Sequence, residues 1–168
     1  MTDAFFKQLE RIHREDDRAA RATMRKAFQQ KGFEDPGIYP YVFPYLGATR
    51  SKEDEDAYLM VAALFAMHPS VPTAGVSLGK AMRRVAGARE SESIEGRFVA
   101  LLRARFEDLP YHLRNAVSLI RATDDSVQLN YEALLKHLRH WSNPSGWVQR
   151  EWARDFWGYE KHTTDATA

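Results

Sequence analysis

EDEDAYLMVAALFAMH, residues 53–68, is the stretch that decides the fold class. Its four carboxylates suit the positive end of a helix dipole. The residues that follow, 57–67, form the longest uninterrupted apolar run of the chain, far shorter than the roughly 20 residues that span a bilayer. Because a helix that is apolar on every side must be covered by neighbours, we predict a buried core helix that ends at His68, before Pro69.

Helical periodicity continues on both sides of this core. Apolar residues recur with a period of about 3.6, and no segment shows the strict alternation of a strand. Asp16 and Asp17 are suited to cap a helix, whereas Pro40 and Pro44 limit the aromatic segment 38–46 to a short one. The predicted helices cover residues 4–13, 18–30, 38–46, 53–68, 78–85, 91–106, 110–121, 130–141 and 146–157. The predicted fold class is therefore all-α, a compact bundle of about eight to nine helices.

The chain length bounds the domain organisation. At 168 residues the chain fits one domain or two small helical lobes that share a core. Gly87 marks the predicted division, with lobes over residues 1–87 and 88–160 and a frayed tail over 161–168. The absence of cysteine suits a reducing compartment and rules out disulfides and thiolate zinc sites. The N-terminus does not have the pattern of a signal peptide, so we expect a cytoplasmic protein with no membrane partner.

Charge is unevenly distributed along the chain. The formal net charge is only +1, which by itself indicates no nucleic-acid partner. Between residues 57 and 123, however, nine basic residues stand against five acidic ones, and in the whole chain arginine outnumbers lysine by seventeen to seven. The planar guanidinium matches phosphate geometry and is weakly hydrated. We predict that the nucleic-acid contacts come from ten residues: Arg25, Lys26, Lys80, Arg83, Arg84, Arg97, Arg103, Arg114, Arg121 and Arg139.

A series of cations near the N-terminus has a helical spacing. From Lys7 to Arg25 the basic residues recur every four or three positions and would line one face of a continuous helix. Such a stripe can follow a phosphate backbone, but Asp16 and Asp17 are expected to interrupt the helix. A solvated helix face is the simpler interpretation for most of the stripe, and its end at Arg25 and Lys26 is the better candidate for binding.

Three patterns that could indicate catalysis, metal binding or base stacking have structural interpretations. The segment 75–79 matches the Gly-x-Ser-x-Gly elbow, but that elbow needs a preceding strand, and here a proline-containing loop precedes it. Ser77 is therefore predicted to cap a helix. His137 and His140 could face one metal, yet no further ligand set accompanies them, and we interpret both as surface or interface residues. The four late tryptophans are assigned mainly to core packing. We predict no catalytic residue, no metal and no cofactor.

The chain resembles the small subunit of the type I-E CRISPR Cascade surveillance complex, the CasB family. Similar segments run in order over nearly the whole chain: RAARATMRKA (18–27), YPYVFPYL (39–46), SLGKAM (77–82), EGRFVALLRA (95–104), LPYHLR (109–114), LLKHLRHW (134–141) and VQREWARDF (148–156). None of these segments is a catalytic signature, so the resemblance to the family rests on the whole set of segments rather than on any single one. Gly96 departs from the pattern of the family, in which a charged or bulkier residue is expected before Arg97. The sequence therefore does not determine the local helix or how far the side chain of Arg97 extends.

The resemblance implies a non-enzymatic, all-helical subunit of a ribonucleoprotein complex that acts in antiviral defence. It implies two copies packed head to tail, in contact with the Cascade backbone subunits and the large subunit. The implied nucleic-acid partners are the guide RNA–target DNA duplex and the displaced single-stranded DNA, and the subunit would stabilise this displaced non-target strand and the R-loop. Two alternatives stay open: a helical adaptor that binds only protein, and a free-standing DNA-binding regulator, although no helix pair shows a clear recognition helix with a tight turn.

Overall fold

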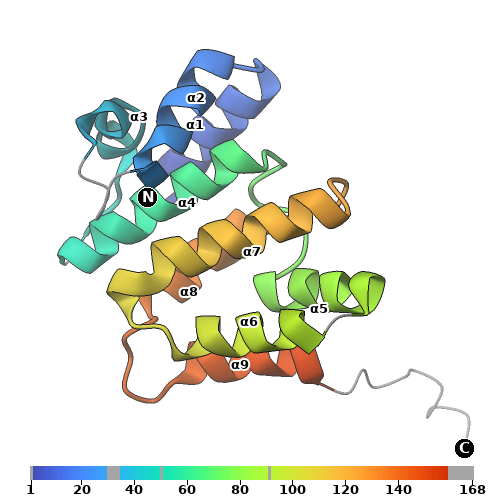
Figure 1. Ribbon diagram of the computed structural model, residues 1–168. Coiled ribbons are helices and arrows are strands. Elements are labelled where there is room, and N and C mark those ends of the chain that lie inside the picture. Colours follow the sequence, from blue (N-terminus) through green and yellow to red (C-terminus); the bar gives the residue numbers. More distant parts are fainter. Residues whose placement is uncertain (1, 30–34, 50, 91, 159–168) are drawn as a thin grey trace, which may run out of the picture.

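The computed structural model describes residues 2–29, 35–49, 51–90 and 92–158, and the predicted frayed tail 161–168 lies outside them. The described backbone is mainly helical (Figure 1), which confirms the all-α prediction. Its α-helices are α1 (Thr2–Arg14), α2 (Arg18–Lys26), α3 (Tyr39–Val42), α4 (Lys52–Met67), α5 (Leu78–Arg89), α6 (Glu92–Arg103), α7 (Leu109–Thr123), α8 (Tyr131–Arg139) and α9 (Trp147–Trp157). Short 3-10 segments lie between them: η1 (Ala27–Gln29), η3 (Pro36–Ile38), η4 (Phe43–Tyr45) and η5 (Phe106–Asp108). Within the described ranges, strand-like pairing is limited to one isolated bridge between Val76 and Leu129.

Helix α4 forms the centre of the bundle, as predicted. It begins in the acidic run, where Ser51 Oγ accepts a hydrogen bond from the backbone N–H of Asp54 (3.2 Å). From Ala57 to Ala66 every residue is buried. α2, α7 and α8 pack against its surface (Figure 1), so a helix without a polar face stays in the interior. Among the described helices, none is both long enough and apolar enough to cross a bilayer.

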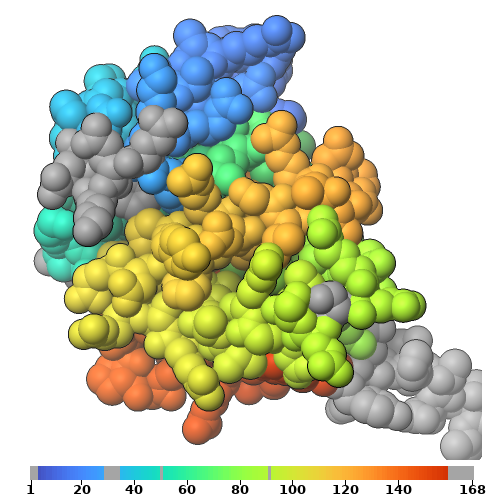
Figure 2. All heavy atoms as spheres, viewed as in Figure 1, coloured from blue at the N-terminus to red at the C-terminus, as the bar shows by residue number. Residues whose placement is uncertain are grey.

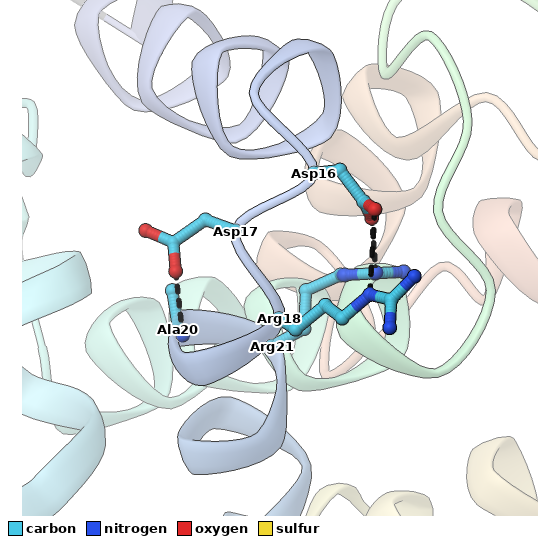
Figure 3. A network of polar contacts seen from close by, with 5 residues as sticks. All are labelled: Asp16, Asp17, Arg18, Ala20 and Arg21. Carbon is cyan, nitrogen blue, oxygen red and sulfur yellow. Dashed lines mark hydrogen bonds and ion pairs between the residues drawn. The ribbon is translucent and has the colours of Figure 1, made fainter.

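The chain turns sharply between α1 and α2. Asp16 has a positive φ of 48°, and the side chain of Asp17 caps α2 by accepting a hydrogen bond from the N–H of Ala20 (3.0 Å; Figure 3). The carboxylate of Asp16 pairs with Arg18 and Arg21 of α2 (Figure 3). The interruption predicted at this aspartate pair is confirmed, so the spaced cations at the N-terminus do not share one continuous helix.

The aromatic segment folds into three short pieces rather than the one short helix predicted over residues 38–46. η3, α3 and η4 follow one another over residues 36–45, with Pro40 in the first turn of α3 and Pro44 in the first turn of η4. A proline has no N–H to donate to the preceding turn, so α3 cannot continue as a regular α-helix through Pro44. Ile38 and Val42 are buried and fix the segment against the core.

Helix α5 is longer than predicted. Gly87 lies inside it, and the helix continues to Arg89, followed by Glu90 in the left-handed region (φ 47°). The predicted end before Gly87 is wrong, because one glycine weakens a helix by about 1 kcal/mol without ending it. Buried apolar side chains from both sides of Gly87 belong to one hydrophobic cluster. The division into lobes 1–87 and 88–160 stays a prediction.

His137 is buried, and the prediction of a surface position for it is wrong. Its ring lies against two indoles of α9, Trp147 and Trp152, at centroid distances of 5.8 and 6.0 Å. The indole N–H of Trp152 donates a hydrogen bond to His137 Nδ1 (2.9 Å). The helical spacing alone did not reveal that α9 covers this part of α8. Trp141 and Trp152 are buried, which confirms core packing for these two tryptophans.

Candidate nucleic-acid interface

Four of the ten predicted contact residues line one surface hollow. Arg25 and Lys26 come from the C-terminal end of α2, and Arg114 and Arg121 come from α7. The hollow has a volume of about 410 Å³. Its lining is completed by Ala22, Phe28, Met67 and Ser118. None of these described lining residues carries a carboxylate, so the hollow is a cationic concavity of the kind that suits a phosphate backbone.

The geometry of α7 explains why Arg114 and Arg121 lie on the same side of the helix. Residues seven apart in a helix lie two turns apart on the same side, and Ser118 lies between them. The other side of α7 is apolar and buried, with Leu113, Val117 and Ile120. Because packing holds that side inward, Arg114, Ser118 and Arg121 are all exposed. Figure 2 shows α7, in yellow and orange, at the surface between α2 and the helices α5 and α6.

Arg121 is held in position by the end of α4. Its Nη1 donates a hydrogen bond to the carbonyl oxygen of Met67 (3.2 Å), the last residue of that helix. The C-terminus of a helix carries unpaired carbonyl groups and the negative end of the dipole, so a guanidinium is stabilised there. A guanidinium has five N–H donors, and this contact leaves others that can meet a phosphate.

Arg25 and Lys26 reach the same hollow from a distant part of the sequence. Both are exposed and occupy the last turn of α2, where cations interact favourably with the helix dipole. The segment that follows them, η1, contacts α7. This contact brings the end of α2 beside Arg114.

Arg84 lies outside this hollow but near the end of α7. It lines a smaller hollow of about 200 Å³ together with Asp124, which follows α7 directly. Hydrogen bonds from the side chain and backbone of Ser126 hold the pKa of Asp124 below its usual range, and Arg84 adds a smaller effect in the same direction. The charge of Arg84 is therefore partly compensated by a carboxylate, whereas the described lining of the first hollow contains none.

The remaining candidates on α5 and α6 are exposed but dispersed. They are Lys80, Arg83, Arg97 and Arg103. Arg83 Nη1 donates a hydrogen bond to the carbonyl oxygen of Gly158 (3.3 Å), and Arg97 lines a separate hollow between α6 and α7. Gly96 does not interrupt α6, and a Cβ at this position would meet no atom within 4 Å. The helix that carries Arg97 is thus continuous.

Arg139 differs from the other candidates because it contacts protein atoms of the bundle. Its guanidinium forms an ion pair with the nearly buried Asp54 (3.4 Å) and donates to the carbonyl oxygen of Ala48 (3.2 Å). It also lies 5.6 Å from the ring centroid of Tyr58, a cation–π arrangement. These contacts join α8 to the start of α4, so Arg139 stabilises the packing of these two helices.

Ser77 caps α5, as predicted. Its Oγ accepts a hydrogen bond from the N–H of Lys80 (3.2 Å) and donates one to Asp155 (2.6 Å). The backbone before it forms the isolated bridge of Val76 and lies outside any named strand, so the sheet that a nucleophile elbow requires is not found in the described chain. Nor do the described residues contain a group of three His, Asp or Glu side chains that could hold a metal ion.

Comparison with known proteins identifies the family. The family model described as CRISPR-associated protein Cse2 matches residues 20–157. The chain belongs to the Cse2 family. The CRISPR-associated protein Cse2 of Thermus thermophilus is 32% identical over 155 residues, which cover 89% of this chain and 88% of that protein. The resemblance carried by the seven sequence segments is thereby confirmed.

Solved structures have the same fold. The crystal structure of a Cse2-family protein from Thermus thermophilus matches with a TM-score of 0.81 and 32% identity, covering 94% of this chain and 97% of that chain. A chain of a structure described as a CRISPR RNA-guided surveillance complex matches with a TM-score of 0.71 and 25% identity, covering 92% of this chain and 89% of that chain. The helical bundle is therefore shared with proteins of this family and with a component of such a complex.

Neutral residues that were not among the predicted contacts lie beside the cations. Ser118, between Arg114 and Arg121, and Tyr111 with Asn115 on the same helix all line surface hollows. The signal that could have found them is the spacing of three and four residues on the polar side of α7. These side chains carry no charge, so the distribution of charge along the chain does not indicate them.

Proposed function

We propose that this chain is the non-catalytic small subunit of a CRISPR RNA-guided surveillance complex and that it holds the backbone of the displaced non-target DNA strand. Membership of the Cse2 family and the likeness to a chain of such a complex support the assignment as a subunit. The observation that carries the nucleic-acid role is the meeting of Arg25, Lys26, Arg114 and Arg121 around one hollow whose described lining includes no carboxylate. In this role the chain contacts the backbone and large subunits, a second copy of itself, and the guide RNA–target DNA duplex.

Electrostatics alone can perform this function. Exchange of a DNA duplex for a guide–target duplex is nearly balanced in free energy, so an interaction on the order of a few kcal/mol decides whether the DNA stays open. Cations that neutralise phosphates of the displaced strand release its counterions and supply such a bias. Backbone contacts carry no sequence information, so the effect is the same for every target.

A salt series tests the proposal. Target binding by the reconstituted complex is measured with the wild-type subunit and with the variant Arg25→Ala/Lys26→Ala/Arg114→Ala. Each contact with a single-strand phosphate contributes about −0.7 to the slope of log affinity against log salt concentration, so loss of three contacts makes the slope less negative by about 2. The fold of the subunit is expected to stay intact, because these side chains are exposed. Under the proposed function, assembly of the subunits and binding of the guide RNA are expected to survive as well.

A matched variant controls for the loss of three positive charges. Lys136, Arg150 and Arg154 are exposed cations on α8 and α9, and their replacement by alanine changes the net charge by the same amount. This control is expected to leave the salt slope near that of the wild type. An unchanged slope in the α2–α7 variant as well favours the adaptor function, in which the same arginines contact carboxylates of a protein neighbour.

A further inference from the structure

We propose that the hollow between α6 and α7 is a pocket for one unstacked nucleobase of a single strand, with Tyr111 as the stacking surface. The inference rests on the proposed function, because it requires that a nucleic-acid backbone lie along the neighbouring side of α7. The pocket has a volume of about 450 Å³ and is formed by residues of α5, α6 and α7. It is distinct from the hollow that contains Arg25 and Arg114.

Tyr111 is the most exposed of the large hydrophobic side chains of the described chain. Tyr111 is 70% exposed, compared with 44% for Trp157 and 36% for Phe43. Trp157 packs on Phe98 and donates its indole N–H to Glu95, whereas the ring contact of Tyr111 is with its sequence neighbour His112 at 5.3 Å. An aromatic face left in water at the rim of a pocket can stack on a base, and base–aromatic stacking tolerates any sequence.

The other groups of the pocket suit a base better than an apolar peptide. Its apolar part includes Met82, Leu101 and Leu119, which can cover the face or edge of a ring. Asn115 presents an amide that both donates and accepts hydrogen bonds, as the edges of the bases do. Arg97 adds a cation from α6, and the described lining residues include no carboxylate. Charge therefore favours an anionic ligand with an aromatic part, which describes a nucleotide.

The helix geometry connects this pocket to the phosphate hollow. Tyr111 and Arg114 are three residues apart on α7, as are Asn115 and Ser118, and such pairs have Cβ atoms roughly 5–6 Å apart. Arg114 and Ser118 line the hollow beside α2, whereas Tyr111 and Asn115 line the pocket beside α6. A strand whose phosphates contact Arg114 can thus direct a base across α7 onto Tyr111.

The test compares two ligands that carry the same phosphates. The purified full chain is titrated at a fixed low salt concentration with a short oligothymidylate and with an oligonucleotide of equal length in which every base is removed. Tyr111→Ala is expected to weaken oligothymidylate binding by roughly 5- to 150-fold, which corresponds to stacking of one base, and to leave binding of the abasic strand unchanged. Tyr111→Phe keeps the aromatic face and is expected to bind both strands as the wild type does.

The outcomes separate this inference from the proposed function. If the wild-type chain binds both strands equally, with a salt dependence that the Arg25→Ala/Lys26→Ala/Arg114→Ala variant lowers, the phosphate interface stands and the base pocket is wrong. The base pocket is also wrong if Tyr111→Ala weakens binding of both strands to the same extent. If the variant only impairs incorporation of the subunit into the complex, the pocket is assigned to a protein neighbour instead. If the chain binds neither strand, the proposed function and the base pocket both fail.

Discussion

His137 couples a titratable ring to the packing of α9. Burial is the main cause that lowers its pKa below the ordinary value of 6.5, and the carboxylate of Glu151, 3.4 Å from Nε2, acts in the opposite direction. The indole N–H of Trp152 can only donate, so His137 Nδ1 must accept and therefore carries no proton. Protonation of Nδ1 would set one N–H group against another. The folded protein thus favours the neutral ring.

The sign of the pH dependence follows from this lowered pKa. As pH falls below about 6.5 the unfolded chain binds a proton at His137 before the folded chain does, so stability decreases, by at most about 1.4 kcal/mol per pH unit. Well above that pH, His137 is neutral in both states and contributes no pH dependence to the stability. His137→Asn retains an acceptor for Trp152 but does not titrate. We expect urea unfolding to show a smaller loss of stability between neutral and mildly acidic pH in this variant than in the wild type, and an equal loss would contradict the assignment.

Arg139 is expected to stabilise the fold rather than to contact nucleic acid, because its guanidinium pairs with Asp54. Arg139→Ala removes the cation beside the carboxylate of Asp54, whose side chain is only 12% exposed, and we expect the free energy of unfolding to fall by about 1–3 kcal/mol. Adding Asp54→Asn to that variant should recover part of the loss, because a neutral amide is less costly to bury. The salt slope of target binding should stay within error of the wild type. A slope that becomes less negative by about 0.7 would instead show that Arg139 contacts a phosphate.

Helix α5 contains two glycines with opposite expected effects. A Cβ at Gly79 would lie 2.7 Å from the carbonyl oxygen of Trp152 and 2.8 Å from Cβ of Asp155, so Gly79→Ala forces α5 away from α9. We expect this change to cost about 1–3 kcal/mol. Gly87, in the same helix, has no atom within 4 Å of such a Cβ, and Gly87→Ala is expected to stabilise by about 0.5–1 kcal/mol. Thermal unfolding of both variants checks the pair, and two changes of the same sign would contradict the packing described for α5.

Local signals made most elements predictable. The acidic start and apolar length of α4, and the side-chain caps Asp17 and Ser77, depend on residues close in sequence. The errors concern contacts between distant residues. The burial of His137 depends on ring contacts with α9, and the end of α5 beyond Gly87 is joined to α7 by a hydrogen bond from Arg89 Nε to Thr123 Oγ1 (2.7 Å). No periodicity within one helix contains that information.

The candidate interface was predictable as a set of residues but not as a surface. The distribution of charge identified Arg25, Lys26, Arg114 and Arg121 among ten candidates. Their meeting depends on η1 touching α7, a contact between segments far apart in sequence. The same tertiary arrangement separates Arg139, which contacts Asp54, from the cations of the hollow. The whole molecule, rather than any segment, therefore defines which arginines can act together.

At the scale of the whole molecule, the helical bundle supports a few exposed cations. α4 and the helices around it bury the apolar side chains in one cluster, and α2 and α7 present their polar sides from that cluster. Under the proposed function, this support determines how long the target DNA stays open. Phosphate contacts stabilise the open DNA relative to the closed duplex, and base pairing with the guide supplies the sequence specificity.

The lifetime of the open DNA in the reconstituted complex is the most direct test of this central claim. Reactivity of unpaired thymines in the displaced strand is followed after a competitor is added, with the wild-type subunit, the Arg25→Ala/Lys26→Ala/Arg114→Ala variant and the control variant at Lys136, Arg150 and Arg154. The proposal predicts that the first variant shortens the lifetime by a similar factor on every matched target, whereas the control leaves it unchanged. A wild-type lifetime with the α2–α7 variant in a fully assembled complex would contradict the claim that these cations hold the displaced strand.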